Sequence, residues 1–203
     1  ADLHSHTIFS SDSMIEPKEY VRRCVERGID CVAVTEHNNI DGALYMGSIA
    51  PFRVIVGDEI MTTAGEIIGL FLREVVPAGL SPEETVERIK QQGGLVDIPH
   101  PFDPFRRGLG EAAMLRVLPG IDIIETFNGR VRLSRHNERA RRFAIEHDEA
   151  MSAGTDAHSQ WELGRVCVEM PSFETPEQFL SSLRDGRIEG RRAPRYVYAF
   201  STL

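Results

Sequence analysis

Short runs of Val and Ile alternate with amphipathic helical segments along most of the chain. The strand candidates are residues 1–4, 31–35, 53–56, 67–72, 95–98, 122–125, 150–153 and 165–169. Short strands of this composition are typical of a sheet that is buried on both faces. Strands that alternate with helices are joined by crossover connections, which make neighbouring strands parallel. The alternation therefore predicts an α/β fold with a mostly parallel sheet.

Helix signals lie between the strands. The segment 17–27 carries one apolar stripe and stops at Gly28. Further helices are predicted to begin at Ser81 and at Thr175, where Pro and Glu follow in the pattern of a capping box. Another helix is predicted over 132–147. Since no repeat, low-complexity tract or linker interrupts the pattern, we expect one domain over residues 1–203.

Composition narrows the class of protein. The chain has 203 residues, 41% of them hydrophobic, and a formal net charge of -8. This charge argues against a stable nucleic-acid partner, because binding to the phosphate backbone favours a basic surface. No run approaches the ~18 apolar residues of a membrane span. The three cysteines have no paired spacing, so we expect reduced core residues and a cytoplasmic location without membrane association.

Potential metal ligands fall at the end of almost every predicted strand. Five of the seven histidines lie just after strands, whereas His136 and His147 follow the helical period and are interpreted as structural. The candidates, with carboxylates included, are Asp2, His4, His6, Asp12, Glu36, His37, Asp58, Glu59, Glu66, His100, Glu125, Asp156 and His158. In a barrel of parallel strands these ends converge on one face. We therefore expect a barrel with outer helices rather than an open doubly wound sheet.

Local spacing supports shared metal sites. His4-x-His6 and Asp156-x-His158 place alternate residues on the same side of an extended chain. Imidazole and carboxylate donors together suit Zn, Mn or Fe, while sites made only of oxygen donors suit Mg or Ca.

Six blocks of sequence resemble one known family. They are Asp2-Leu3-His4-Ser5-His6-Thr7, Ser11-Asp12, Thr35-Glu36-His37, Gly57-Asp58-Glu59, Pro99-His100-Pro101 and Gly154-Thr155-Asp156-Ala157-His158. In this order they are similar to the motifs of the PHP (polymerase and histidinol phosphatase) superfamily. The resemblance implies a distorted (β/α)7 TIM-like barrel and a metal-dependent phosphoesterase, usually with a trinuclear metal site.

The resemblance also implies a ligand set of nine residues. One ion would be bound by His4, His6, Glu59 and Asp156; a second would share Glu59 and add Glu66 and His100; a third would be bound by Asp12, His37 and His158. Two positions depart from the usual pattern. Glu66 replaces a common His, which weakens the preference for Zn and favours Mn, Fe or Mg. Glu36 replaces an Asp, and we expect it, like Asp2, to orient a ligand from outside the cluster.

The expected reaction is hydrolysis of a phosphate ester by a hydroxide that bridges two divalent ions. Asp156 is the candidate that accepts or passes the proton. Arg130 is the first candidate for phosphate binding, beside Asn128 on the same turn, with Arg107 and Arg165 next. The leaving-group acid is not identifiable from the sequence. Trp161 fits a pocket wall and plain packing equally well.

Several functions remain open at this point. The leading interpretation is a phosphatase of a small phosphorylated molecule or nucleotide, with two or three ions drawn from Zn, Mn, Fe and Mg. The main alternative is an exonuclease or oligonucleotide phosphodiesterase, or a proofreading-type domain associated with a DNA polymerase. A non-enzymatic metal-binding scaffold and an amidohydrolase are less favoured. Monoester or diester preference, substrate, native metal and oligomeric state are not indicated by the sequence.

Overall fold

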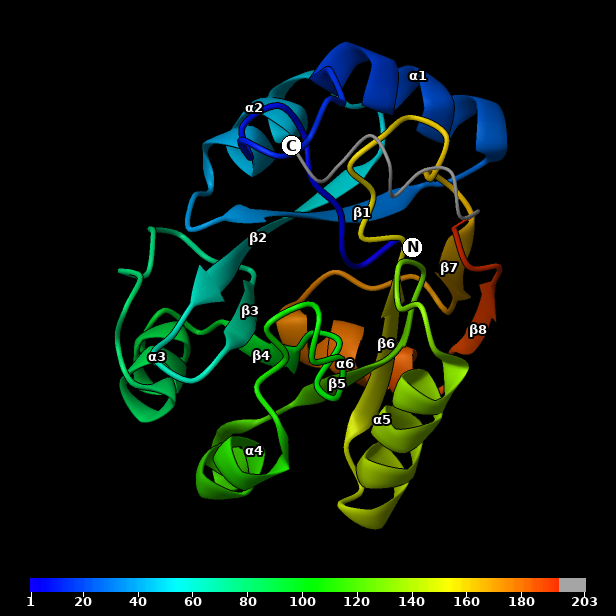
Figure 1. Cartoon of the computed structure of the whole chain (residues 1–203). Coiled ribbons are helices and arrows are strands. Elements are labelled where there is room, and N and C mark those ends of the chain that lie inside the picture. Colours follow the sequence, from blue (N-terminus) through cyan, green and yellow to red (C-terminus); the bar gives the residue numbers. More distant parts are fainter. Residues whose placement is uncertain (194–203) are drawn as a thin grey trace.

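A computed structural model describes residues 1–193 of the chain (Figure 1). The helices are α1 (Pro17–Arg27), α2 (Asp41–Ile49), α3 (Pro82–Gln91), α4 (Glu111–Val117), η1 (Leu118–Gly120), α5 (Ser134–Glu146) and α6 (Pro176–Arg184). The strands are β1 (Cys31–His37), β2 (Arg53–Met61), β3 (Glu66–Leu70), β4 (Leu95–Ile98), β5 (Ile123–Asn128), β6 (Ala150–Gly154), β7 (Val166–Glu169) and β8 (Arg187–Gly190). The predicted α/β class is confirmed.

The main sheet is curved and has six strands in the order β1-β2-β3-β4-β5-β6. It is mixed rather than parallel throughout, because β3 runs antiparallel to both β2 and β4. The remaining pairs, β1 with β2, β4 with β5 and β5 with β6, are parallel. The hairpin between β2 and β3 thus takes the place of one expected βα unit.

The N-terminal segment lies between the two edge strands. Asp2 forms a parallel bridge with Val32 of β1, and Ser5 forms one with Ala157, just after β6. Backbone hydrogen bonds from Leu3 to Ala153 and from Ala33 to Asp2 extend these contacts. The close approach requires glycine at position 154, where a Cβ atom would lie 2.3 Å from the Cβ of His4. Residues 1–6 therefore connect both edges of the sheet without forming a regular strand.

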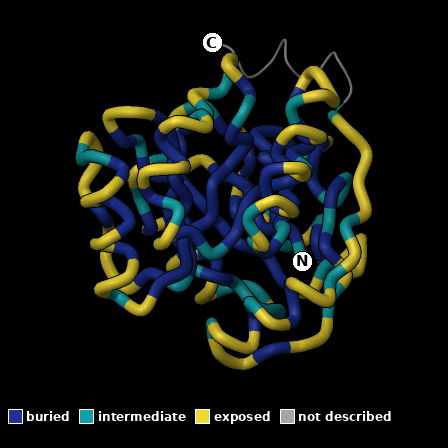
Figure 2. Tube along the Cα trace, turned by 90° about the horizontal axis from the view of Figure 1, so that it is seen from below, coloured by how far each residue is buried: buried dark blue, intermediate teal, exposed yellow. Residues whose placement is uncertain are grey.

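On the concave face of the sheet, the side chains change from apolar to acidic along the strands β2 and β5. On β2, Ile55 and Glu59 share a face because side chains alternate, and on β5 the same is true of Ile123 and Glu125. Ile55 and Ile123 belong to a buried cluster that also contains Phe179 of α6. Figure 2 shows that the buried positions gather in the middle of the molecule. The apolar part of this face thus packs on α6, and the carboxylates lie further along the strands.

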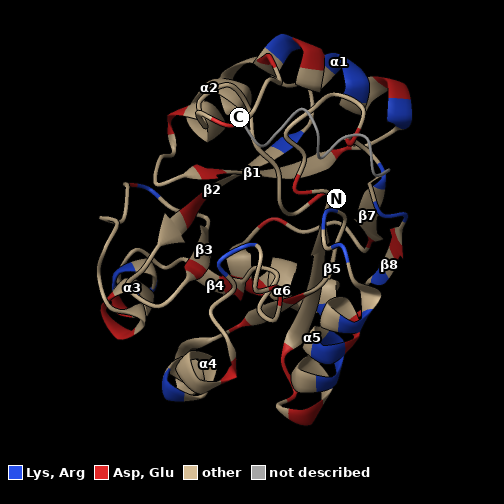
Figure 3. Cartoon of the chain, in the orientation of Figure 1, with Lys and Arg blue, Asp and Glu red and all other residues tan. Residues whose placement is uncertain are grey.

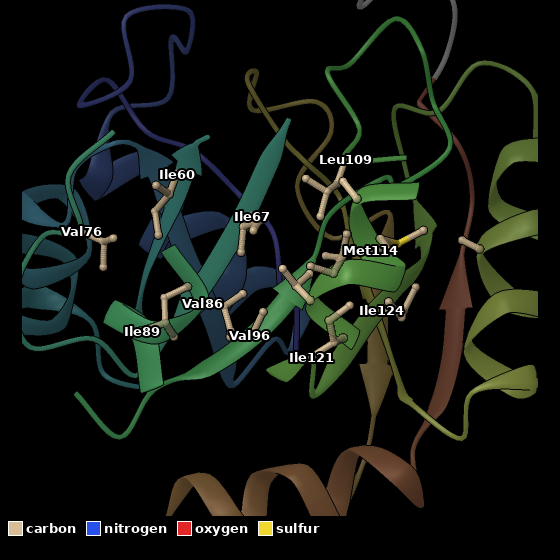
Figure 4. Close-up of a cluster of buried hydrophobic side chains, with 14 of the residues drawn as sticks. Ile60, Ile67, Val76, Val86, Ile89, Val96, Leu109, Met114, Ile121 and Ile124 are labelled. Carbon is tan, nitrogen blue, oxygen red and sulfur yellow. The ribbon is translucent and has the colours of Figure 1, made fainter. Parts of the chain in front are cut away.

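A second apolar cluster packs α3, α4 and α5 against the outer face of the sheet (Figure 4). Its members include Ile89 of α3, Met114 of α4 and Phe143 of α5, with Ile60 and Ile124 from the strands. The predicted capping box of α3 is present, since the Ser81 side chain accepts a hydrogen bond from the Glu84 amide and the Glu84 side chain accepts one from the Ser81 amide. These contacts fix the strands whose ends carry the polar residues.

Several elements differ from the sequence-based expectation. The sequence did not predict α2, α4 or β8. The predicted strand 165–169 forms as β7, but it pairs with β8 in a separate two-stranded sheet. The strand predicted at 53–56 extends to Met61, so that Glu59 lies within it. Within the described part of the chain, no helix has the length and apolarity needed to cross a membrane.

Candidate metal centre

The strand ends bring the metal-capable side chains to one rim of the sheet. Glu59 lies near the carboxyl end of β2, and His37 ends β1 beside it in register. Glu66 begins β3, which is antiparallel, so its amino-terminal end lies at the same rim. Figure 3 shows acidic residues at this position on β2 and β3. The reversed direction of β3 explains how a residue at the start of a strand joins residues at the ends of the others.

Glu59 is the centre of the cluster. Its Oε2 lies 3.4 Å from His4 Nε2 and 3.3 Å from His6 Nε2. Oδ1 of Asp156 lies 3.8 and 3.5 Å from the same two nitrogens. All four side chains are buried, and neither Nε2 atom has a hydrogen-bond partner. The four residues expected at the first ion thus point their donor atoms toward one another.

The expected second group lies on the other side of Glu59. His100 Nε2 is 3.1 Å from Glu59 Oε1 and 3.7 Å from Glu66 Oε2. Burial and the negative charge of Glu59 raise the pKa of Glu66 to about 8. A cation between the two carboxylates would reverse this effect, because opposite charge favours the ionised form.

The expected third group lies nearer the surface. Asp12 Oδ2 is 3.3 Å from His37 Nε2 and 3.2 Å from His158 Nε2. The Asp12 side chain is 39% exposed and that of His37 30%, whereas His158 is buried. His37 Nδ1 also lies 3.1 Å from Glu59 Oε2, so His37 connects this group to the centre.

The donor atoms fit bound divalent ions. Atoms bound to one ion at about 2.0–2.1 Å in a tetrahedron lie about 3.3 Å from one another. The separations around Glu59 are of this size, and among residues 1–193 four groups of three potential ligands have donor atoms within 4.8 Å of one another. Buried imidazole nitrogens without hydrogen-bond partners are rare unless a metal or water satisfies them. The geometry therefore fits a cluster of metal ions.

Comparison with known proteins assigns the family. Residues 2–94 match the model of the PHP domain, and residues 134–188 match that of the PHP-associated region. The chain belongs to the PHP superfamily. Two uncharacterized proteins of Methanocaldococcus jannaschii are similar to it. MJ1587 is 42% identical over 141 residues, which cover 63% of this chain and 82% of MJ1587. MJ0417 is 35% identical over 195 residues, which cover 90% of this chain and 78% of MJ0417.

Solved structures share the PHP fold at low sequence identity. A two-domain protein from Bacteroides vulgatus, which contains a predicted PHP-like metal-dependent phosphoesterase, has a TM-score of 0.74 and 20% identity. The match covers 94% of this chain but only 64% of that protein. The lesion-specific endonuclease Q of Pyrococcus furiosus has a TM-score of 0.69 and 17% identity, over 92% of this chain and 56% of the endonuclease. Another endonuclease Q structure contains a 27-mer duplex substrate with an abasic lesion at its active site.

Carboxylates outside the PHP cluster orient two of its imidazoles. Glu125 Oε1 lies 3.1 Å from His4 Nδ1, which directs His4 Nε2 toward Glu59. On the other side, Ser10 Oγ lies 3.3 Å from His6 Nδ1 and donates a hydrogen bond of 2.5 Å to Glu36. Such outer partners fix the tautomer and the ring orientation of ligating histidines. The sequence singled out Glu125 only as one of many strand-end acids.

Asp2 has a different role from the one expected. Its carboxylate accepts hydrogen bonds from Thr155 N and Thr155 Oγ1, at 2.9 and 2.6 Å, and only a long one from the backbone of His4. Asp2 therefore fixes the turn after β6 rather than an imidazole. His136, expected to be purely structural, lies 3.6 Å from the buried Asp103 in the loop that follows β4.

Two residues of the cluster have unusual backbone conformations. His100 has a φ of 30° and Asp156 a φ of 53°, both in the region that residues with a side chain rarely adopt. Such conformations persist where the surrounding structure holds them, and they concentrate at functional sites. The sequence contains no signal for them, since neither position is glycine.

The arginine and asparagine candidates lie in different surroundings. Arg130 is buried, with Nε 3.1 Å from Glu162 Oε1, and the Nε of Arg165 donates to the Trp161 carbonyl. Arg107 Nη1 lies 3.9 Å from Met61 Sδ.

Asn128 lies at the cluster, where its Nδ2 donates hydrogen bonds to Glu125 and Asp156 at 3.0 Å each. Arg106, which the sequence did not favour over its neighbour Arg107, contacts the cluster through Asp156 Oδ2. The charge of Arg130 also acts on a member of the cluster, since it contributes to the lowered pKa of His158 after burial.

Proposed function

We propose that this PHP protein hydrolyses a phosphate ester, as a phosphatase of a small phosphorylated molecule or a nucleotide. The observation that carries the proposal is the convergence of three donor groups on Glu59. Its carboxylate lies within 3.4 Å of nitrogens of four imidazoles, those of His4, His6, His37 and His100. A carboxylate so placed can bridge two ions. Such paired sites suit the in-line displacement of a phosphate ester.

Divalent ions bound in this cluster would lower the pKa of a bound water and polarise the phosphoryl oxygens. The protein side chains orient the donor atoms and accept a proton. His4 and His6 hold their Nε2 atoms toward Glu59, each fixed through Nδ1. Asp156 Oδ1 faces these nitrogens, while Oδ2 accepts a hydrogen bond from Asn128. We assign the carboxylate of Asp156 as the group that accepts or passes the proton during the reaction.

The proposed cofactor is two or three ions of Mn, Fe, Zn or Mg. The inner groups around Glu59 combine imidazole with carboxylate donors, which suits Mn, Fe or Zn. Glu66 adds a hard oxygen ligand at the second ion and favours Mn, Fe or Mg there. Asp12, His37 and His158 form the third site. Residues 1–203 are proposed as one PHP phosphoesterase domain with a distorted (β/α)7 barrel, in which residues 1–6 take the place of a strand.

A second candidate is cleavage of a phosphodiester in nucleic acid. The similarity in fold to endonuclease Q favours it, since that enzyme has a DNA substrate. The formal net charge of -8 disfavours it, because phosphate-backbone contacts need a basic surface. A free phosphorylated molecule therefore remains the first proposal, and the cytoplasmic location stays a prediction from the sequence.

One experiment tests both candidates. The purified protein is freed of metal with a chelator and reloaded with Mn, Zn, Fe or Mg in turn. Phosphate release from nucleotides and other phosphorylated metabolites is measured beside nucleotide release from single-stranded and abasic duplex DNA. Phosphate release that depends on metal supports the first proposal. Cleavage of DNA alone supports the second, and inactivity on both with a full metal complement contradicts both.

A further inference from the structure

Arg106 lies at the metal cluster in a way that the other candidate arginines do not. Its Nη1 contacts Oδ2 of Asp156, while its side chain remains 20% exposed. Arg130, in contrast, has a side chain that is only 4% exposed and is paired with Glu162, which is itself buried. A guanidinium at the cluster that still reaches solvent can meet a substrate that arrives from outside.

The loop that carries Arg106 is held by hydrogen bonds within it and to β3. Asp103 is buried; its carboxylate accepts from the Phe105 amide at 3.0 Å, and its carbonyl accepts from the Arg106 amide at 3.2 Å. The Arg107 carbonyl accepts from the Glu66 amide at 3.0 Å, which ties the loop to the start of β3. Arg107 has a φ of 51°, a left-handed conformation that turns the chain. The fold therefore presents Arg106 and Arg107 differently, one toward Asp156 and the other toward Met61.

We propose that Arg106 binds the phosphoryl group of the substrate and positions it against the metal cluster. This inference rests on the proposed phosphoesterase function. A guanidinium has five N–H donors in a rigid fork, which matches two oxygens of a phosphoryl group. Asp156 occupies only part of this donor set. If Asp156 helps to hold an ion, the guanidinium donors that it does not occupy would be available to an anion at the cluster.

Three variants test the assignment. Arg106→Met removes the charge with similar length, and Arg106→Lys keeps the charge without the fork. Arg116→Ala is the control, because Arg116 is an exposed surface arginine paired with Glu83 on α3. Binding of inorganic phosphate to the metal-loaded proteins is measured by calorimetry, metal content by elemental analysis, and kcat and KM with the best substrate.

We expect Arg106→Met to bind inorganic phosphate about 10- to 100-fold more weakly with unchanged metal content, and to lose about 100-fold in kcat/KM. Arg106→Lys should recover part of both losses, and Arg116→Ala should match the wild type. Unchanged phosphate affinity in Arg106→Met would overturn the assignment, as would a loss of phosphate affinity that follows only from lost metal. If the wild type hydrolyses no ester but binds phosphate through Arg106, the proposed function fails and this inference stands.

Discussion

The inner and outer parts of the metal cluster are built differently. Around Glu59, the side chains of His4, His6 and Asp156 are almost wholly buried, and both imidazoles are held by partners behind them. In the outer part, the side chains of Asp12 and His37 are 39% and 30% exposed and are paired chiefly with other members of the cluster. The inner side chains are therefore held by contacts with the surrounding protein, whereas Asp12 and His37 are held mainly by other members of the cluster.

Protonation does not follow this division. Burial would lower the pKa of His4 in the inner part, but the charges of Glu59 and Glu125 outweigh this and raise it to about 10, whereas burial lowers the pKa of His158 in the outer group to about 4. Burial lowers the pKa of His6 well below its usual value, with the charges of His158 and His37 adding to the effect. Burial would also lower the pKa of His37, but its hydrogen bonds with Asp12 and Glu59 outweigh this and raise it to about 10. A ligating imidazole must be deprotonated. At neutral pH His6 is thus ready for metal, while His37 must release a proton first.

Removal of the central carboxylate should have the largest effect. In Glu59→Gln the shape is kept, but the charge shared by four imidazoles is lost. We expect metal content to fall by at least two equivalents and kcat to fall by at least about 10³-fold, because both proposed inner sites use this side chain. Elemental analysis and steady-state kinetics measure these quantities.

Glu111→Gln is the matched control, because Glu111 is a surface acid paired with Arg139 on α5. A Glu59→Gln protein that folds normally by circular dichroism and still binds its full metal complement would show that Glu59 is not the shared ligand. The difference between the inner and outer parts would then need another cause.

The sequence predicted which residues form this cluster better than it predicted the residues that orient them. Strand ends gave the candidate residues, and the resemblance to the PHP motifs reduced them to nine expected ligands. The structure brings these nine side chains together, and their binding of metal stays a prediction. The outer contacts depend on long-range packing: Glu125 lies 121 positions from His4 in the chain. Glu66 was placed correctly at the rim by the motif, but only the antiparallel direction of β3 explains its position. The choice of Arg107 over Arg106 had no basis in the sequence, since the turn at Arg107 is a tertiary feature.

A substitution of Glu125 tests whether this carboxylate orients His4 in the inner part of the cluster. In Glu125→Gln, His4 Nδ1 loses a carboxylate acceptor, so its tautomer and ring orientation are less firmly set. Losses of such outer partners typically cost about 10- to 100-fold in metal affinity or activity. We expect a loss in this range, measured by competition with a metal indicator and by kcat/KM. Wild-type affinity in this variant would indicate that the Nε2 orientation of His4 is fixed by packing alone.

A substitution in the outer group of Asp12, His37 and His158 should reduce metal content and activity less than one in the inner part. In Asp12→Asn the third site loses its charged oxygen ligand, but Glu59 and its inner partners are untouched. We expect a loss of about one equivalent of metal and a decrease in activity of about 10-fold, smaller than for either inner variant. Since Asp12 is partly exposed, water can replace the lost ligand. A loss of all bound metal in this variant would show that the inner and outer parts bind their ions together rather than independently.

Asp97 of β4 gives the smallest effect on activity and a distinct effect on stability. Burial and the charge of Glu125 raise its pKa to about 7, and its Oδ2 accepts a hydrogen bond from Ser152. A carboxyl with a folded pKa above its unfolded value of 3.8 lowers stability as the pH rises from about 4 to about 7, because the folded state retains the proton longer.

Asp97→Asn removes this dependence, since the amide does not titrate. We expect the stability of the variant relative to wild type to increase between pH 5 and pH 8 by about 2–3 kcal/mol, because one pKa unit corresponds to about 1.4 kcal/mol. Chemical denaturation of the metal-free proteins at the two pH values measures it, with kcat as the check that the cluster is intact. A stability difference that does not change with pH would show that burial and the charge of Glu125 do not raise the pKa of Asp97 in the folded protein.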